Sequence, residues 1–451
     1  MVAPVVITRR MARFADDRFG TDAGLRYLLD KIYPDHWSFY LGEFALYAFV
    51  SIVVTGVWLT FVYDASPAGA FASVVALSRN APVGYLVRQV HHWSAVTFVA
   101  AILLHMARIF FTAAFRKPRE LNWVVGFLLL VFGFLAGFTG YSLPFDVLSG
   151  TGLRIAQSVL LSIPFVGGWA ADVFTGGGFP GPSLLSHLYT LHVFFLPIAI
   201  ALLVSLHLGM MVYQKHTQFV SDERHVVGRR FWPDYALRTL AAFGLSTGVM
   251  LALAGSIEIN GIEAYGPYQD WTVPNPAAPD WYAAFLDGAL RLGPAWELRI
   301  AGHPIPAVFW PGVALPTVVL AFIGAWPWLD AVVSRDRGAH SVLVPPTFAP
   351  WRVGVGCALI FAGLVLTLAA ADDQQAFALH VSVQSLVTFY RFLLFFGSAG
   401  AGLMAALVAR GLRTHAESAG NKLERVVVLR RVPSGGYAEE EPQPDEEPQP
   451  V

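Results

Sequence analysis

The stretch R-Q-V-H-H-W-S-A-V-T-F-V-A-A-I-L-L-H-M-A-R, residues 88–108, holds two histidines, His91 and His105, 14 residues apart in an apolar segment. A second apolar stretch, L-H-V-F-F-L-P-I-A-I-A-L-L-V-S-L-H at 191–207, holds His192 and His207, 15 residues apart. Both spacings are close to four helical turns, so each pair lies on one helix face, roughly 21 to 23 Å apart along the axis. Two such helices side by side would present two His–His couples, which is the geometry for two stacked, bis-histidine haems across a bilayer.

A lone histidine on an apolar helix is usually a hydrogen-bonded structural residue. Four histidines at matched spacing on two spanning segments favour ligands instead, because ionisable groups inside a membrane are costly and mostly functional. His92 competes with His91, but the 13 residues from His92 to His105 place those two on opposite faces of a helix. We therefore predict that His91 is the ligand and that His92 is a neighbour.

The composition indicates a polytopic membrane protein. The chain has 451 residues, of which 55% are hydrophobic and 14% charged, and its mean hydropathy is +0.55. The net charge of −1 does not indicate nucleic-acid binding. The single cysteine, Cys357, and the lack of a C-x-x-C-H motif predict neither an Fe–S cluster nor a c-type haem in this chain.

Eight apolar segments are long enough to cross about 30 Å of hydrocarbon, which predicts an all-α fold with eight transmembrane helices. We place them at 39–63, 86–113, 121–141, 187–213, 236–256, 307–329, 352–371 and 388–410. Lys and Arg are concentrated before the first segment, in every second link and after the last, whereas the first and third links carry only Arg79 and Arg154. This bias predicts that both termini are cytoplasmic. His91 and His192 are then the outer couple, and His105 and His207 the inner couple.

The segments divide the chain into four parts: a cytoplasmic segment 1–38, a di-haem four-helix bundle 39–235, a second membrane part 236–410 and a cytoplasmic tail 411–451. Two long outer links, 142–186 and 257–306, are rich in Gly, Pro and aromatic residues, and such loops usually carry function. The tail from Gly435 onward is acidic and Pro-rich, and we expect it to be disordered.

Two glycine pairs repeat the histidine spacing. Gly42 and Gly56 are 14 residues apart in the first segment, and so are Gly126 and Gly140 in the third. Small residues also serve ordinary helix packing in membranes. Because the period matches that of the histidines, we predict that these four glycines let the haem edges approach the backbone.

In these residues the chain resembles the cytochrome b subunits of quinol–cytochrome c reductases, and most of all the actinobacterial cytochrome bcc form. The resemblance covers about residues 30–435. It rests on the four histidines, the four glycines and several further segments. These are F-R-K-P-R-E (115–120), G-Y-S-L-P (140–144), L-H-V-F-F-L-P (191–197), Q-K-H-T-Q-F (214–219) and R-V-P-S-G-G-Y (431–437). It implies that Arg88 and Arg108 lie by haem propionates.

The quinol-oxidation motif of that family, usually P-E-W-Y, reads P-D-W-Y here, at Pro279, Asp280, Trp281 and Tyr282. The resemblance implies that Asp280, with Tyr282, accepts a proton from quinol; without it, a solvated loop aspartate is an equal alternative. His187 stands where relatives often have Arg.

The inner quinone site does not transfer residue by residue. Thr239 stands where mitochondrial relatives have an acid, and Val212 where they have a histidine. By position alone, the candidates for this site are Lys215, His216 and Arg238.

The resemblance implies a subunit that oxidises quinol, expected to be menaquinol, at the outer site and passes electrons through two non-covalent b haems to an inner quinone site. It implies a Rieske iron–sulfur subunit, a di-haem cytochrome c subunit, a haem-copper oxidase in a supercomplex, a homodimeric complex and membrane lipid as partners in a bacterial cell membrane. Two other classes stay open: the b-haem anchor of a formate dehydrogenase or hydrogenase, and a haem-free secondary transporter.

Overall fold

The computed structural model describes residues 14, 16–18, 29–219, 228–274, 278–300, 302–418, 428–431 and 437–440. Within them, seven helical runs are long and apolar enough to span a membrane, and an eighth apolar stretch is bent. The predicted all-α polytopic fold is confirmed. The seven runs are Trp37–Leu59, Val83–Phe111, Glu120–Ser142, Leu184–Gln214, Phe231–Ser256, Pro350–Ala369 and Val383–His415.

Four of these runs form a bundle. Its main helices are α3 (Tyr40–Leu59), α5 (Pro82–Phe111), α6 (Glu120–Ser142) and α10 (Leu196–Gln214). Helix α3 packs along α5, α6 packs along α10, and α11 (Ala236–Ser256) covers α3 and α5. The bundle thus brings together the helices that carry the paired histidines and the paired glycines.

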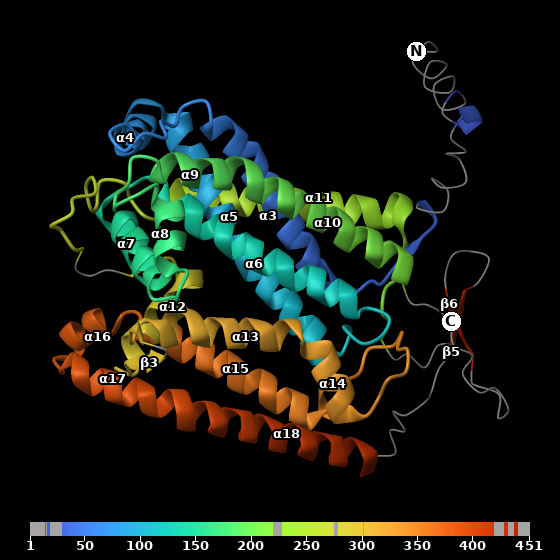
Figure 1. Cartoon of the computed structure of the whole chain (residues 1–451). Helices are drawn as coiled ribbons and strands as arrows, with labels where there is room; N and C mark the ends of the chain where they lie inside the picture. The colour runs from blue at the N-terminus through green and yellow to red at the C-terminus, as the bar shows by residue number, and fades with distance from the viewer. Residues whose placement is uncertain are drawn as a thin grey trace.

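A second layer lies beside the bundle (Figure 1). It contains α13 (Leu315–Gly324), α15 (Pro350–Ala369), α17 (Val383–Phe392) and α18 (Ser398–Ser418). Helix α15 packs against α18 and against α12 (Trp281–Leu292), which belongs to the second long link. Helix α12 also contacts α5 and α6, so it joins the two layers.

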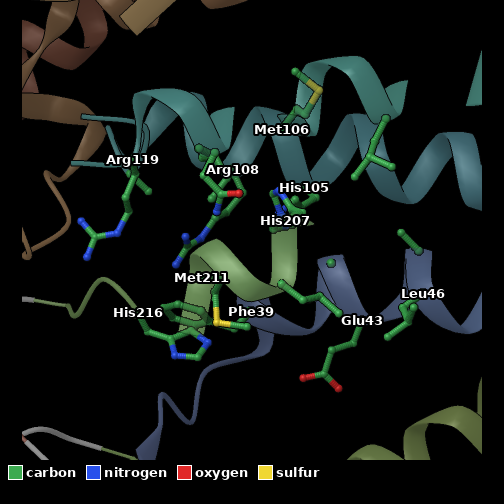
Figure 2. Close-up of a pocket in the computed structure, with 18 of the residues that line it drawn as sticks. Phe39, Glu43, Leu46, His105, Met106, Arg108, Arg119, His207, Met211 and His216 are labelled. Carbon is green, nitrogen blue, oxygen red and sulfur yellow. The ribbon is translucent and has the colours of Figure 1, made fainter. Parts of the chain in front are cut away.

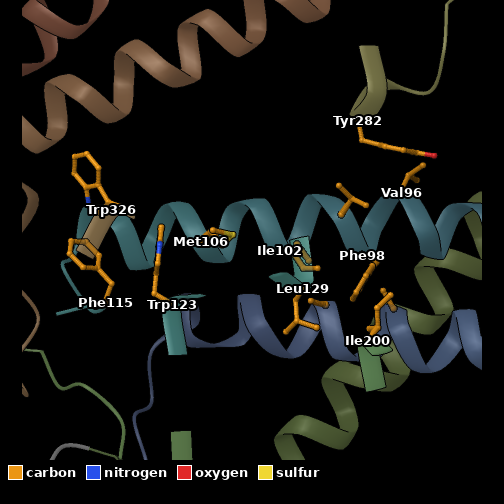
Figure 3. Close-up of a cluster of buried hydrophobic side chains, with 14 of the residues drawn as sticks. Val96, Phe98, Ile102, Met106, Phe115, Trp123, Leu129, Ile200, Tyr282 and Trp326 are labelled. Carbon is orange, nitrogen blue, oxygen red and sulfur yellow. The ribbon is translucent and has the colours of Figure 1, made fainter. Parts of the chain in front are cut away.

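The bundle core is apolar along α5. Figure 3 shows Phe98, Ile102 and Met106 on this helix, with Leu129 of α6 and Ile200 of α10 beside them. All five side chains are buried in one cluster.

The fourth run contains a π-helical turn, η2 (Leu191–Phe195), between α9 (Leu184–Thr190) and α10. The amide of Leu196 bonds to the carbonyl of Leu191, five residues back, so this turn holds one residue more than an α-helical turn. Pro197, which has no amide hydrogen, follows directly. The extra residue explains why His192 and His207 are 15 residues apart whereas His91 and His105, on an α-helix, are 14 apart.

The sixth predicted segment, 307–329, is not one straight helix. It consists of η4 (Trp310–Ala314) and α13, followed after Ala325 by α14 (Trp326–Ser334), with a bend of 62°. Pro327 cannot donate a hydrogen bond to the carbonyl of Ile323, four residues back. The indole of Trp123 donates to that carbonyl instead, at 2.9 Å, which satisfies the broken helix from outside.

The two long links are ordered at one end of the molecule, and shorter pieces complete the chain (Figure 1). Asp146 begins α7 with a reciprocal capping box to Ser149, and the ring of Tyr268 in the second link packs at a tilt against that of Phe145 in the first, with centroids 5.0 Å apart. The two long links contain α7 (Val147–Leu161), α8 (Gly167–Thr175), β3 (Leu298–Ile300) and β4 (His303–Ile305). Two shorter links contain α4 (Ala70–Asn80) and α16 (Asp372–Leu379). The other short elements are β1 (Ile32–Tyr33), η1 (Trp37–Phe39), β2 (Arg229–Arg230), η3 (Phe231–Tyr235), η5 (Pro346–Phe348) and η6 (Leu393–Gly397).

The expectation of disorder from Gly435 onward is wrong for residues Tyr437–Glu440. They form strand β6, which pairs antiparallel with β5 (Val428–Arg431). The backbone pairing of the two strands therefore extends two residues past the point at which the acidic, Pro-rich composition begins. Residues 441–451 lie outside the described residues.

Candidate functional site

The four histidines meet as two couples. The rings of His91 and His192 have centroids 6.2 Å apart, and those of His105 and His207 are 6.4 Å apart. A transition metal lies about 2 Å from an imidazole nitrogen, so a metal between two facing rings puts their centres about 6 Å apart. Both couples therefore have the spacing of two axial ligands with an iron between them.

Hydrogen bonds from neighbouring helices determine the tautomer of the outer couple. Nδ1 of His192 lies 3.0 Å from the carbonyl of Ala136, which can only accept, so this nitrogen carries the proton. Nδ1 of His91 lies 2.9 Å from Oγ1 of Thr55, whose hydroxyl hydrogen is donated to the carbonyl of Ser51 at 2.6 Å. Both Nδ1 atoms are thus donors, which leaves each Nε2 with the free electron pair that a metal needs.

The inner couple has weaker support. Nδ1 of His105 is buried with no hydrogen-bond partner among the described residues, and Nδ1 of His207 makes no well-aligned hydrogen bond, although the backbone of Asn122 lies close enough to act on it as an acceptor. The two couples share spacing and burial, but they differ in the groups that orient their rings.

Each predicted glycine faces one histidine ring. A Cβ on Gly56 would lie 3.1 Å from Cε1 of His91, and one on Gly140 only 2.5 Å from Cε1 of His192. At the inner level, a Cβ on Gly42 would lie 3.1 Å from His105, and one on Gly126 lies 3.5 Å from His207. The approach to an imidazole requires glycine at Gly140, is tight at Gly42 and Gly56, and is an ordinary contact at Gly126.

A cavity of about 250 Å³ lies beside the inner couple (Figure 2). Both histidines, Gly42 and Gly126 line it, and so does Arg108. The guanidinium of Arg108 lies 4.1 Å above the ring of Phe39, and its Nη2 is buried without a partner among the described residues. A cavity with two facing imidazoles, two glycines and a spare buried guanidinium fits a haem with its propionate on Arg108.

Of the three inner quinone candidates, two line this cavity and one does not. Lys215 and His216 are lining residues. Burial, followed by the charges of Lys31, Arg119 and Arg108, lowers the pKa of His216 to about 3, so the ring is neutral at physiological pH. Arg238 is partly exposed and pairs with Asp35 at 3.1 Å, outside the cavity lining.

The sequence reasoning missed an acidic group at the same cavity. Glu43, in the first turn of α3, is a lining residue, and its carboxylate accepts hydrogen bonds from Tyr47, Tyr235 and Thr239. Tyr235 and Thr239 lie about the start of α11, far along the chain from Glu43. No local pattern marks this cluster, because an acid in the first turn of a helix is favoured by the helix dipole anyway.

At the other end of the bundle, Asp280 is not a solvated loop residue. Its side chain is 7% exposed, and its Oδ2 lies 2.9 Å from Nε2 of His92. Its Oδ1 accepts a hydrogen bond of 2.8 Å from Asn260. His92, predicted as a mere neighbour of the ligand, is thus the partner of the acid in the P-D-W-Y motif.

Tyr282 is buried against α6, where a Cβ on Gly137 would lie 2.9 Å from the ring. Burial, then the charge of Asp280 and the hydrogen bond to it, raise the pKa of Tyr282 well above its ordinary value. Its phenol therefore stays protonated. It can donate a hydrogen bond, but it cannot take a proton from a substrate. Trp281 is partly exposed beside it.

Arg88, the predicted outer propionate residue, is paired. Its Nη2 lies 2.9 Å from Glu258 and its Nη1 donates to the carbonyl of Asn260, while its Nε is buried without a partner among the described residues. His187 lies on α9 with an exposed side chain.

Comparisons with known proteins agree on one family. The model described as "Cytochrome b(N-terminal)/b6/petB" matches residues 96–267. The "Cytochrome bc1 complex cytochrome b subunit" of Streptomyces coelicolor is 38% identical over 452 residues, covering 95% of this chain and 83% of that protein. The protein of the same name from Mycobacterium tuberculosis H37Rv is 40% identical over 400 residues, covering 84% and 73%. A chain of the "Hyperthermophilic respiratory Complex III" has the same fold, with a TM-score of 0.67, 21% identity and coverage of 88% of this chain and 99% of that one.

Proposed function

The chain belongs to the family of cytochrome b subunits of the cytochrome bc1 complex, and from this premise we propose how its residues carry out quinol oxidation and transmembrane electron transfer. As a member of this family, it is the multi-pass b subunit of a respiratory quinol–cytochrome c reductase. The family is one of b-type cytochromes. We assign one haem to His91 and His192 and a second to His105 and His207, both held without covalent attachment.

The observation that carries this proposal is the pair of ring spacings, 6.2 and 6.4 Å, each with two glycine backbones against the imidazoles. When bound, each haem supplies one-electron transfer. Thr55 and Ala136 hold the outer ligands in the tautomer that leaves Nε2 free. Arg108 neutralises a propionate at the inner level.

At the outer site, Asp280 is the proton acceptor. A carboxylate at the head of α12 can take a proton from a quinol hydroxyl when it lies within hydrogen-bond reach. His92 and Asn260 fix one oxygen each, so the carboxylate is held in a single orientation. The phenol of Tyr282 stays neutral and orients the substrate or Asp280 by donating a hydrogen bond.

The same proposal extends to the surroundings of the subunit. Both termini lie in the cytoplasm of a bacterial cell, and the substrate is menaquinol. A Rieske iron–sulfur subunit takes the first electron and a di-haem cytochrome c subunit receives it, in a dimeric complex that associates with a haem-copper oxidase. Residues 39–235 carry the haems, and residues 236–410 complete the quinol site.

Two measurements test the proposal. A reduced-minus-oxidised spectrum of the purified complex is expected to show two b-type components, and their absence would leave the histidine couples without a haem role. Reduction of cytochrome c by added menaquinol then separates a reductase from a membrane anchor of a formate dehydrogenase or hydrogenase. An anchor retains the two components but gives no quinol-driven reduction of cytochrome c.

A further inference from the structure

We propose that Glu43 is the proton-donating group of the cavity beside the inner couple, and that Tyr47, Tyr235 and Thr239 hold its carboxylate after it has released the proton. The proposal rests on the proposed function, because it takes the part of the cavity between Glu43 and His216, beside the space assigned to the inner haem, as the place where a quinone is reduced. It assigns that chemistry to a residue on α3 instead of to the basic candidates near the end of α10.

The hydrogen bonds define what this carboxyl group can do. Tyr47 donates to Oε2 at 2.5 Å, Thr239 donates to the same oxygen, and Tyr235 donates to Oε1. A carboxylate accepts at both oxygens, which together offer about four lone-pair sites, so it can take all three hydroxyl donors at once. Hydrogen bonds from three donors stabilise the charged form.

The charge of Glu43 is balanced by hydroxyls and not by a cation. Among the residues that the structure describes, no Lys, Arg or His forms an ion pair with Glu43. Arg238, one residue before Thr239, pairs with Asp35 and Asp234. A carboxylate without a salt-bridge partner can be protonated and deprotonated without breaking an ion pair. The titratable and charged groups around it are Tyr40, Tyr47, Tyr235, Asp35 and Arg238.

The position of Glu43 joins the cavity to the neighbouring surface. It follows Gly42, whose backbone is against His105, and both residues line the cavity. Figure 2 shows its carboxylate directed away from His105 and His207, on the flank of the cavity opposite Arg119. Tyr235 and Tyr47 are buried, whereas Glu43 and Thr239 are only partly buried, so water can reach the acid while the two tyrosines hold it from the buried side.

The proton and electron balance is as follows. Conversion of a quinone to a quinol takes up two electrons and two protons. A haem held by His105 and His207 would supply the electrons one at a time, and with each electron the Glu43 carboxyl breaks its O–H bond as a new O–H bond forms on a quinone oxygen. The three hydroxyls hold the carboxylate until water on the cytoplasmic side returns a proton, so two such cycles complete one quinol.

The test uses the complete purified complex with Glu43→Gln, which keeps the size of the side chain but cannot release a proton as an acid. Glu120→Gln is the matched control, because Glu120 is also a first-turn acid at the same end of the bundle but does not line the cavity. The b haems are first reduced, and their reoxidation by a water-soluble naphthoquinone is followed with a pH-indicator dye for proton uptake. Glu43→Asp measures rescue by a shorter acid.

We expect Glu43→Gln to retain both b-type components and to slow reoxidation and proton uptake together by at least about 10-fold, since a positioned acid typically contributes about 10² to 10⁴. Glu120→Gln should match the parent, and Glu43→Asp should recover most of the rate. A parental rate in Glu43→Gln with both components present overturns the inference and leaves the proposed function intact. If Glu43→Gln does not assemble, Tyr235→Phe decides, and a parental rate there overturns the inference as well. Absence of two b components in the parent would instead contradict the proposed function.

Discussion

The outer and inner couples have nearly the same ring spacing but different surroundings. Thr55 and the carbonyl of Ala136 accept from Nδ1 of the outer histidines, whereas among the described residues Nδ1 of His105 has no partner and Nδ1 of His207 has only a poorly aligned acceptor in the backbone of Asn122. Hydrogen bonds at Nδ1 raise the basicity of a ligand and favour the oxidised metal. The comparison shows that helix geometry sets where a couple lies, while the flanking helices set its electronic character.

Charge adds to the same difference. At the outer level Arg88 is neutralised by Glu258 at 2.9 Å. At the inner level Arg108 has no carboxylate partner in the described part of the chain, and the cavity is also lined by Arg119 and Lys215. Positive charge stabilises a reduced haem. We therefore expect the haem held by the inner couple to have the higher midpoint potential. Electrons would then run from the outer haem to the inner haem.

The largest expected effect separates the two adjacent histidines. His91→Ala should remove one b-type spectral component entirely, because the outer couple loses a ligand. His92→Ala should keep both components, because its ring faces Asp280 and not His192. The measurement is haem content by difference spectroscopy, and loss of a component in His92→Ala alone would show that the ligand register is wrong.

A large effect on rate is expected at Asp280, on the outer side only. Asp280→Asn keeps the size and the contact to Asn260 but cannot accept a proton, and we expect quinol oxidation to slow by roughly 10- to 1,000-fold with normal haem spectra. Asp280→Glu should retain substantial activity. Steady-state menaquinol oxidation across pH is the readout, and a parental rate for the Asn variant would reduce Asp280 to a structural residue.

A smaller effect is expected from the glycines, and it should differ between the outer and the inner couple. Gly140→Ala places a Cβ 2.5 Å from His192, whereas Gly126→Ala places one 3.5 Å from His207, an ordinary contact. We expect the first change to cost about 1 to 3 kcal/mol and to lower occupancy of the outer haem. The second should leave both haems in place. Equal haem content in the two variants would mean that the rings move aside freely.

The smallest effect is expected from Thr55→Val, which removes the acceptor for Nδ1 of His91 but keeps the shape of the side chain. The outer haem then loses the Nδ1 hydrogen bond that favours its oxidised form. Its midpoint potential should therefore rise towards that of the inner haem. Potentiometric titration measures the shift. An unchanged potential would show that this hydrogen bond does not tune the outer couple.

Spacing and hydropathy within single segments were enough to predict seven spans and to single out the histidines and glycines as candidates, because the helical period of 3.6 residues is a local property of the sequence. The bend after Ala325 could have been suspected from Pro327. The hydrogen bond that satisfies the freed carbonyl of Ile323, however, comes from Trp123 of another helix. The cluster around Glu43 and the pair of His92 with Asp280 join residues far apart in sequence, and no periodicity encodes such contacts. Arg238, a candidate by position alone, pairs with Asp35 outside the cavity lining, and this long-range contact has no local signal in the sequence either.

The most direct test of the central claim is a potentiometric titration of the purified complex, followed by absorbance of the b haems. Two one-electron components are expected in the parent, the lower lost in His91→Ala and the higher lost in His105→Ala. One component in the parent, or loss of the same component in both variants, would contradict the assignment of one haem to each couple.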